Sequence, residues 1–230
     1  PQEGVSVVQK RQMITQEGNN VYVAAVTGNF DDAQAGVKRI FADSSFATRL
    51  QAEGLKLSSA NSINWGRLVP QIIYYISAYV DLLDAEEIKP GDKVNIVVPT
   101  GNFGNILAAY YASRMGLPVN RLICASNSNN VLTEFINTGS YDRNREFHKT
   151  ISPSMDILIS SNLERLLYEV TDHDADRVRG WMQELAEKGY YEIDDNSRSI
   201  IRQNFQGGYC SDEDTLDTIR QTWKQYRYLP

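Results

Sequence analysis

Residues 94–105 read VNIVVPTGNFGN, a short β-branched run that stops at a proline and continues into a turn with two glycines. The apolar run Val94, Ile96, Val97 and Val98 is typical of a buried strand in a parallel sheet. Residues 106–115 are rich in Ala, Leu and Tyr, which favours a helix. We therefore expect a strand, a glycine loop and a helix in direct succession.

This succession predicts an anion site. A loop that opens a helix at the carboxyl end of a strand directs free backbone N–H groups and the positive helix end to one spot, where a phosphate fits. The loop has no Lys or Arg, so main-chain donors and the side chains of Asn102 and Asn105 would hold the ligand. It is neither a Walker A loop nor a Gly-x-Gly-x-x-Gly fingerprint. An ordinary strand–helix turn that uses glycine for steric reasons explains the same pattern.

The composition indicates a soluble globular protein. The chain has 230 residues, 42% of them hydrophobic, with a mean hydropathy of −0.41. A net charge of −6 argues against nucleic acid or an anionic membrane as partner. No apolar run is long enough to cross a bilayer and no signal peptide is visible, and Cys124 and Cys210 form no motif. We expect free thiols in the cytoplasm, and a piece of a longer protein because the chain starts at Pro1 without Met.

Alternating helix and strand patterns predict an α/β fold with a three-layer, Rossmann-like parallel sheet, split over two lobes. Strands are expected at 21–26, 55–57, 94–98 and 121–125. Helices are expected at 7–15, 30–41 with Asn29 as N-cap, 44–54, 64–83, 106–115, 161–170, 174–188, 196–205 (closed by Gly207 and Gly208) and 211–226. Residues 138–149 are charged and are expected to be an exposed excursion, and helical additions are expected after about residue 150.

A second polar cluster, SSANSINWGR at 58–67, precedes the strongest helical pattern. Arg67 falls in the first helical turn, where the helix dipole disfavours a cation. A bound anion would make this position of the cation favourable, because both the guanidinium and the positive end of the helix would attract the anion. The alternative is that Arg67 reaches solvent or a carboxylate, and that Ser62 and Asn64 are only caps.

A third polar stretch, SNSNN at 126–130, follows the strand at 121–125. Two neighbouring strands thus end in polar loops, at the sheet edge where open α/β sheets bind ligands. The histidines do not indicate a site, because His148 and His173 lie in charged surroundings and are expected to be solvated. No group of residues has metal-ligand spacing, and there is no Gly-x-Ser-x-Gly elbow.

Five segments in this order resemble threonine synthase, and together they extend over essentially the whole chain. They are Gly28-Asn29-Phe30-Asp31-Asp32-Ala33; Asn61-Ser62-Ile63-Asn64 with Arg67; Pro99-Thr100-Gly101-Asn102-Phe103-Gly104-Asn105; Ser154-Met155-Asp156-Ile157; and Ser161-Asn162-Leu163-Glu164-Arg165. The family consists of fold-type-II pyridoxal phosphate enzymes, similar to tryptophan synthase β and cysteine synthase. Its members convert O-phosphohomoserine and water to threonine and phosphate by β,γ-replacement.

The resemblance implies two phosphate sites. Gly101, Asn102, Phe103, Gly104 and Asn105 match the loop that holds the phosphate of pyridoxal 5′-phosphate. The substrate phosphate would be gripped by Asn61, Ser62 and Arg67. Residues 1–60 would belong to the smaller domain of such an enzyme, and residues 61–230 to the larger.

The resemblance also implies that this chain lacks the Schiff-base lysine, so no catalytic residue is assigned. In the family that lysine lies in a Phe-Lys-Asp motif, which occurs nowhere in this sequence. We therefore expect a threonine synthase fragment that is inactive alone, with the remainder of the enzyme chain as its partner. The alternative is a non-catalytic, threonine-synthase-like protein that binds phosphorylated ligands.

Overall fold

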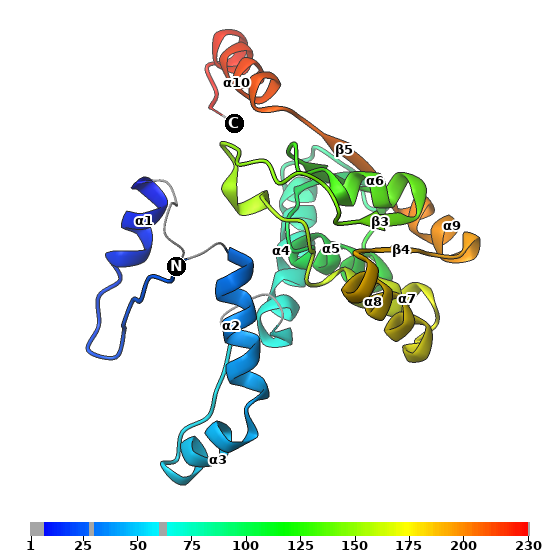
Figure 1. Cartoon of the computed structure of the whole chain (residues 1–230). Helices are drawn as coiled ribbons and strands as arrows, with labels where there is room; N and C mark the ends of the chain where they lie inside the picture. Colours follow the sequence, from blue (N-terminus) through cyan, green and yellow to red (C-terminus); the bar gives the residue numbers. More distant parts are fainter. Residues whose placement is uncertain (1–6, 28–29, 60–63, 230) are drawn as a thin grey trace. The chain divides into compact units, whose positions relative to one another are not determined.

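The computed structural model describes residues 7–27, 30–59 and 64–229. It divides into two compact units, residues 1–59 and 60–230, whose elements are labelled in Figure 1. The division falls in the serine- and asparagine-rich stretch that precedes the strongest helical pattern.

The first unit is helical. It contains α1 (Val7–Ile14), α2 (Phe30–Ala42) and α3 (Ser44–Ala52), as the sequence pattern predicts. Asp43 caps α3 by accepting hydrogen bonds from the Phe46 N–H at 2.9 Å and the Ser45 hydroxyl at 2.8 Å. These bonds lower the pKa of the Asp43 carboxyl. The expected N-cap of α2, Asn29, lies outside the described residues.

The two strands expected in the first unit are absent from the described residues. Apart from an isolated bridge at Val26, residues 21–26 form no ladder, and residues 55–57 form none either. Val21 and Val23 are 40% and 42% exposed. Both predictions are wrong because apolar composition alone does not make a strand; a strand also needs a hydrogen-bonded neighbour.

The second unit contains the parallel sheet. It consists of β1 (Val94–Pro99), β2 (Val119–Ser126) and β5 (Phe205–Tyr209), in the order β1-β2-β5. In the register of the sheet, Leu122 lies between Ile96 and Phe205. The α/β class with a parallel sheet is thus confirmed, as are the strands expected at 94–98 and 121–125.

The third strand differs from the sequence prediction. We expected a helix to residue 205 and a stop at Gly207 and Gly208, whereas α9 (Asp195–Asn204) ends earlier and Phe205 begins β5. A glycine pair usually marks a turn. Here Gly207 serves close packing instead, because a Cβ on it would lie 2.8 Å from the Cα of Thr133 in α6 (Val131–Thr138). Figure 1 shows α6 alongside β5.

One face of the sheet forms the core. Ile96, Val98, Leu122 and Phe205 point to this face, and α5 (Gly104–Arg114) packs on it through Tyr110, whose ring lies 5.5 Å from that of Phe205. On the opposite face of β1 the side chain of Val97 is 61% exposed.

A two-stranded antiparallel sheet joins residues far apart in sequence. It pairs β3 (Ser140–Asp142) with β4 (Tyr190–Glu192), and the rings of Tyr141 and Tyr191 stack at 5.3 Å. Burial raises the pKa of both phenols. The expectation that residues 138–149 form an exposed excursion is therefore wrong at Tyr141, which is 1% exposed.

The remaining helices, except the short 3₁₀ turn η1 (Pro153–Met155), follow the predicted pattern. They are α4 (Trp65–Asp84), α7 (Leu163–Val170), α8 (Ala175–Lys188) and α10 (Asp212–Tyr226). The side chains of Asn64, Asp174, Asp194 and Ser211 cap α4, α8, α9 and α10. Ser161 is not the cap of α7, because that helix begins after Asn162. Within the described ranges, none of the helices is both long and apolar enough to cross a membrane.

The contact between β5 and α6 gives a direct test. In Gly207→Ala the new methyl would meet the backbone of Thr133, with the Thr133 carbonyl oxygen only 2.9 Å away. We expect a loss of about 1–3 kcal/mol in the free energy of unfolding, measured by urea denaturation. The control is Gly208→Ala, since a Cβ there has nothing within 4 Å, and its change should stay within about 0.5 kcal/mol. Equal losses in the two variants would contradict the packing argument.

Candidate functional site

The loop between β1 and α5 begins at Thr100, which ties it to the neighbouring strand. The Thr100 N–H donates to the Ala125 carbonyl at 2.8 Å, and its hydroxyl donates to the Val98 carbonyl at 2.6 Å. Thr100 is 4% exposed. The predicted glycine loop is thus anchored at the carboxyl edge of the sheet.

Phe103 turns the chain into α5 with a left-handed backbone, at φ 62°. This conformation is unusual for a bulky residue and is held only where the surroundings enforce it. The Phe103 ring supplies that constraint, since it is 1% exposed and lies 5.6 Å from the ring of Phe205. The sequence predicts that Phe103 lies in the loop, but it does not predict that this residue makes the left-handed turn.

The loop carbonyls are held from behind. The Ser160 hydroxyl donates to the Gly101 carbonyl at 3.0 Å, and Asn162 donates to the Asn102 carbonyl from its N–H at 3.1 Å and its side chain at 2.8 Å. In a trans peptide the following N–H points the opposite way. The N–H groups of Asn102 and Phe103 therefore face away from these anchors.

The first turn of α5 leaves main-chain donors available. Phe103 provides no side-chain cap, and within the described part of the chain no oxygen accepts from the N–H groups of Gly104, Asn105 and Ile106. Gly104 and Ile106 are buried. Buried N–H groups normally have an acceptor, so this donor set suits a phosphate.

The side chain of Asn105 is already engaged. Its amide donates to the Gln71 side chain at 2.9 Å and accepts from the Tyr75 hydroxyl at 2.5 Å, both residues of α4. Burial raises the pKa of Tyr75 to about 12, so this phenol stays a donor. Asn105 thus offers a ligand only its main-chain N–H, whereas the sequence suggested its side chain as well.

The second predicted cluster is described only in part. Asn61 and Ser62 lie outside the described residues. Asn64 caps α4 by accepting from the Gly66 N–H at 3.0 Å. Arg67 lies in the first turn as predicted, exposed, and its guanidinium makes no hydrogen bond or ion pair with any residue that the structure describes.

The polar loop after β2 makes internal contacts. Asn127 and Asn129 are 4% and 3% exposed, and both side chains donate to the carboxylate of Asp156, at 2.8 Å and 3.0 Å. This loop therefore serves as a structural anchor, and its amides point to residues 148–156 rather than to an open site.

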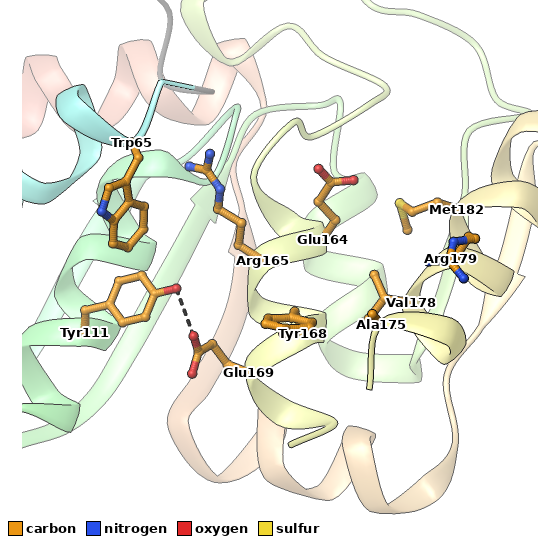
Figure 2. A pocket seen from close by; sticks show the side chains of 10 residues that line it. All are labelled: Trp65, Tyr111, Glu164, Arg165, Tyr168, Glu169, Ala175, Val178, Arg179 and Met182. Atoms are coloured by element: carbon orange, nitrogen blue, oxygen red, sulfur yellow. Dashed lines mark hydrogen bonds between the residues drawn. The ribbon is translucent and has the colours of Figure 1, made fainter. Parts of the chain in front are cut away.

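A pocket of about 600 Å³ lies beside the start of α4. Figure 2 shows Trp65 and Tyr111 on one side and residues of α7 and α8 on the other. The Arg165 guanidinium lies 5.6 Å from the Trp65 ring, and Tyr111 donates to the Glu169 carboxylate at 3.2 Å. Burial and the Glu169 charge raise the pKa of Tyr111 to about 12. Of the lining residues, Trp65, Glu164 and Arg165 fall within segments quoted from the sequence, where nothing indicated a pocket. The others gave no signal because they converge only in the fold.

In the described part of the chain, the histidines and cysteines do not come together into a further site; the His173 ring lies against Tyr168 and Glu169. His148 and His173 are exposed, and Cys124 and Cys210 are free thiols. Burial raises the pKa of the Cys124 thiol to about 11, so it stays protonated. Across the described ranges, no three His, Cys, Asp or Glu residues gather as a metal site would require.

No protein-family model matches the chain. Threonine synthase-like 1 of Homo sapiens is 45% identical over 231 residues, which cover 100% of this chain and 31% of the human protein. Threonine synthase of Pseudomonas aeruginosa is 40% identical over 224 residues, which cover 97% of this chain and 45% of the bacterial enzyme.

Solved structures give the same result. The pyridoxal-phosphate-bound threonine synthase of Brucella melitensis superposes with a TM-score of 0.83 at 43% identity, over 100% of this chain and 47% of that structure. The yeast threonine synthase gives 0.79 at 37% identity, over 95% and 43%. The chain thus spans less than half the length of these relatives. Along essentially its whole length, it is homologous to a segment of the threonine synthases and threonine synthase-like proteins, and it shares the fold of that segment.

Proposed function

We propose that this chain is part of a cytoplasmic threonine synthase and supplies its two phosphate sites. The whole enzyme would convert O-phosphohomoserine and water to threonine and phosphate by β,γ-replacement. Residues 1–60 would belong to its smaller domain and 61–230 to its larger one, in keeping with the two compact units. The Schiff-base lysine would come from outside this chain, so the chain alone would be inactive.

The observation that carries the proposal is the donor set at the start of α5. The N–H groups of Gly104, Asn105 and Ile106 have no acceptor among the described residues. Together with loop residues 101–103 they would hold the phosphate of pyridoxal 5′-phosphate. When bound, this cofactor supplies an electron sink for negative charge that develops on the substrate.

Arg67 would grip the phosphate of the substrate, together with Asn61 and Ser62. An exposed guanidinium in the first turn of a helix opposes the helix dipole. A phosphate dianion next to it would turn this unfavourable arrangement into a favourable one. The requirement for two anion sites follows from the proposed reaction, in which both the cofactor and the substrate carry a phosphate.

A second candidate is a threonine-synthase-like protein that binds phosphorylated ligands without catalysis. It is considered because the chain is 45% identical to threonine synthase-like 1, a relative that is not named as the enzyme itself. Release of inorganic phosphate from O-phosphohomoserine by the complete protein separates the two. Phosphate release supports the enzyme, and ligand binding without release supports the binder.

The cofactor loop is tested by Gly104→Val. Gly104 is buried at the helix start, so a branched side chain there would occupy the space next to the proposed phosphate. We expect the complete protein to lose pyridoxal phosphate, measured by absorbance after dialysis, while circular dichroism shows a retained fold. The control is Gly180→Val, because a Cβ on Gly180 in α8 has nothing within 4 Å. Normal cofactor retention in Gly104→Val would show that the loop is only a turn.

The substrate site is tested by Arg67→Ala in the complete protein. A charge-assisted contact to a phosphate is worth about 1.5–3 kcal/mol, so kcat/KM for O-phosphohomoserine should fall roughly ten- to a hundred-fold. Arg67→Lys keeps the charge but loses the planar fork and should recover part of the loss. Cofactor content should stay normal. The control is Arg114→Ala, which removes an exposed arginine in the last turn of α5. If Arg67→Ala changes kcat/KM no more than this control does, the assignment of Arg67 to the substrate phosphate is ruled out.

A further inference from the structure

The segment Ser154-Met155-Asp156-Ile157 has no role in the site so far, although it lies directly behind the cofactor loop. A Cβ on Gly101 would lie 2.7 Å from the Ser154 carbonyl oxygen and 3.4 Å from the Met155 Cα. The backbone of this segment therefore touches the loop at its first glycine. The position of residues 153–155 limits where Gly101 can be.

Asp156 fixes that position. One of its carboxylate oxygens accepts from the side chains of Asn127 at 2.8 Å, Asn129 at 3.0 Å and Thr150 at 2.7 Å. The other oxygen accepts from the Thr150 N–H at 3.0 Å. Asn127 and Asn129 directly follow β2. One carboxylate thus fastens η1 to the end of the strand next to β1.

The same segment continues to the two anchors of the loop carbonyls. Ser160 holds the Gly101 carbonyl, and Asn162 holds the Asn102 carbonyl. Residues 150–162, here called the bracing segment, therefore contact the back of the loop at three places: Gly101 at its Cα, Gly101 at its carbonyl and Asn102 at its carbonyl. Asp156 is the only acidic residue of the bracing segment.

We propose that Asp156 is a positioning residue for the cofactor loop: it holds the bracing segment so that the main-chain N–H groups of the loop face the ligand phosphate. This inference rests on the proposed function for the identity of the ligand. Its geometric part, that Asp156 orders the loop, concerns this chain alone.

The test compares Asp156→Asn with the unmodified complete protein by hydrogen exchange and mass spectrometry. An asparagine would place an N–H₂ group against donors that now meet carboxylate oxygens. We expect the three hydrogen-bonded amides that hold the loop, those of Thr100, Leu107 and Asn162, to exchange at least about tenfold faster, while those of α8 and α9 stay unchanged. The affinity for pyridoxal phosphate, measured by its absorbance in a titration, should fall by a similar factor.

Glu146→Gln is the matched control. Glu146 is exposed and lies four residues before the bracing segment, and its carboxylate makes no hydrogen bond or ion pair with any residue that the structure describes. It should leave both the exchange of these three amides and the affinity unchanged. A milder variant, Thr150→Val, removes one hydroxyl donor to Asp156 and keeps the N–H bond, so it should give a smaller effect in the same direction.

Three results would overturn the inference. The first is unchanged exchange of the Thr100, Leu107 and Asn162 amides in Asp156→Asn. The second is faster exchange throughout the chain in both Asp156→Asn and Thr150→Val, because the carboxylate would then support the fold as a whole. The third is lost affinity with unchanged loop exchange, because Asp156 would then act on the ligand directly. If the unmodified complete protein binds no pyridoxal phosphate, the proposed function fails, and the exchange experiment still decides the role of Asp156.

Discussion

The carbonyl oxygens of Gly101 and Asn102 are bound from behind by Ser160 and Asn162, and the geometry of the candidate site depends on this constraint. A peptide unit is rigid, so fixing its carbonyl fixes the direction of the next N–H. A loop with no cationic side chain has only such N–H groups and a helix end to offer an anion. Under the proposed function, recognition of the anion would therefore depend on backbone orientation, which side chains distant in sequence control.

The rest of the second unit supports this orientation in three ways. The parallel sheet sets where the loop starts, because Thr100 bonds to Ala125 on the neighbouring strand. The core sets how the loop turns, because Phe103 takes its left-handed backbone only while its ring is packed on Phe205. Helix α4 binds the Asn105 side chain through Gln71 and Tyr75, so that side chain is not available to a ligand. The groups left to face the proposed ligand are a small set of main-chain N–H donors.

Local patterns were sufficient to predict the strand, the loop and the helix around residues 94–115, because each depends on residues next to it in sequence. They also placed Arg67 in the first turn of α4. They failed where the deciding partner is remote. The local sequence predicts Gly207 as a helix stop, because it does not show that Thr133 packs against this glycine. It predicts Tyr141 as exposed, because it does not show that Tyr191 stacks on this ring. The same applies to the anchors Ser160 and Asn162: polar residues before a helix are read as caps, and nothing local shows which carbonyl they bind.

The pairing of β2 with β5 also bears on the order in which the chain folds. Leu122 and Phe205 are neighbours in the sheet although they lie more than eighty residues apart along the chain. Bringing such distant segments together costs loop-closure entropy, so helices between them form earlier than the strand pair. Phe103 obtains its partner ring only when β5 arrives. We therefore expect the loop between β1 and α5 to reach its final shape late in folding, and under the proposed function the chain would bind its ligand only once its most distant contacts have formed.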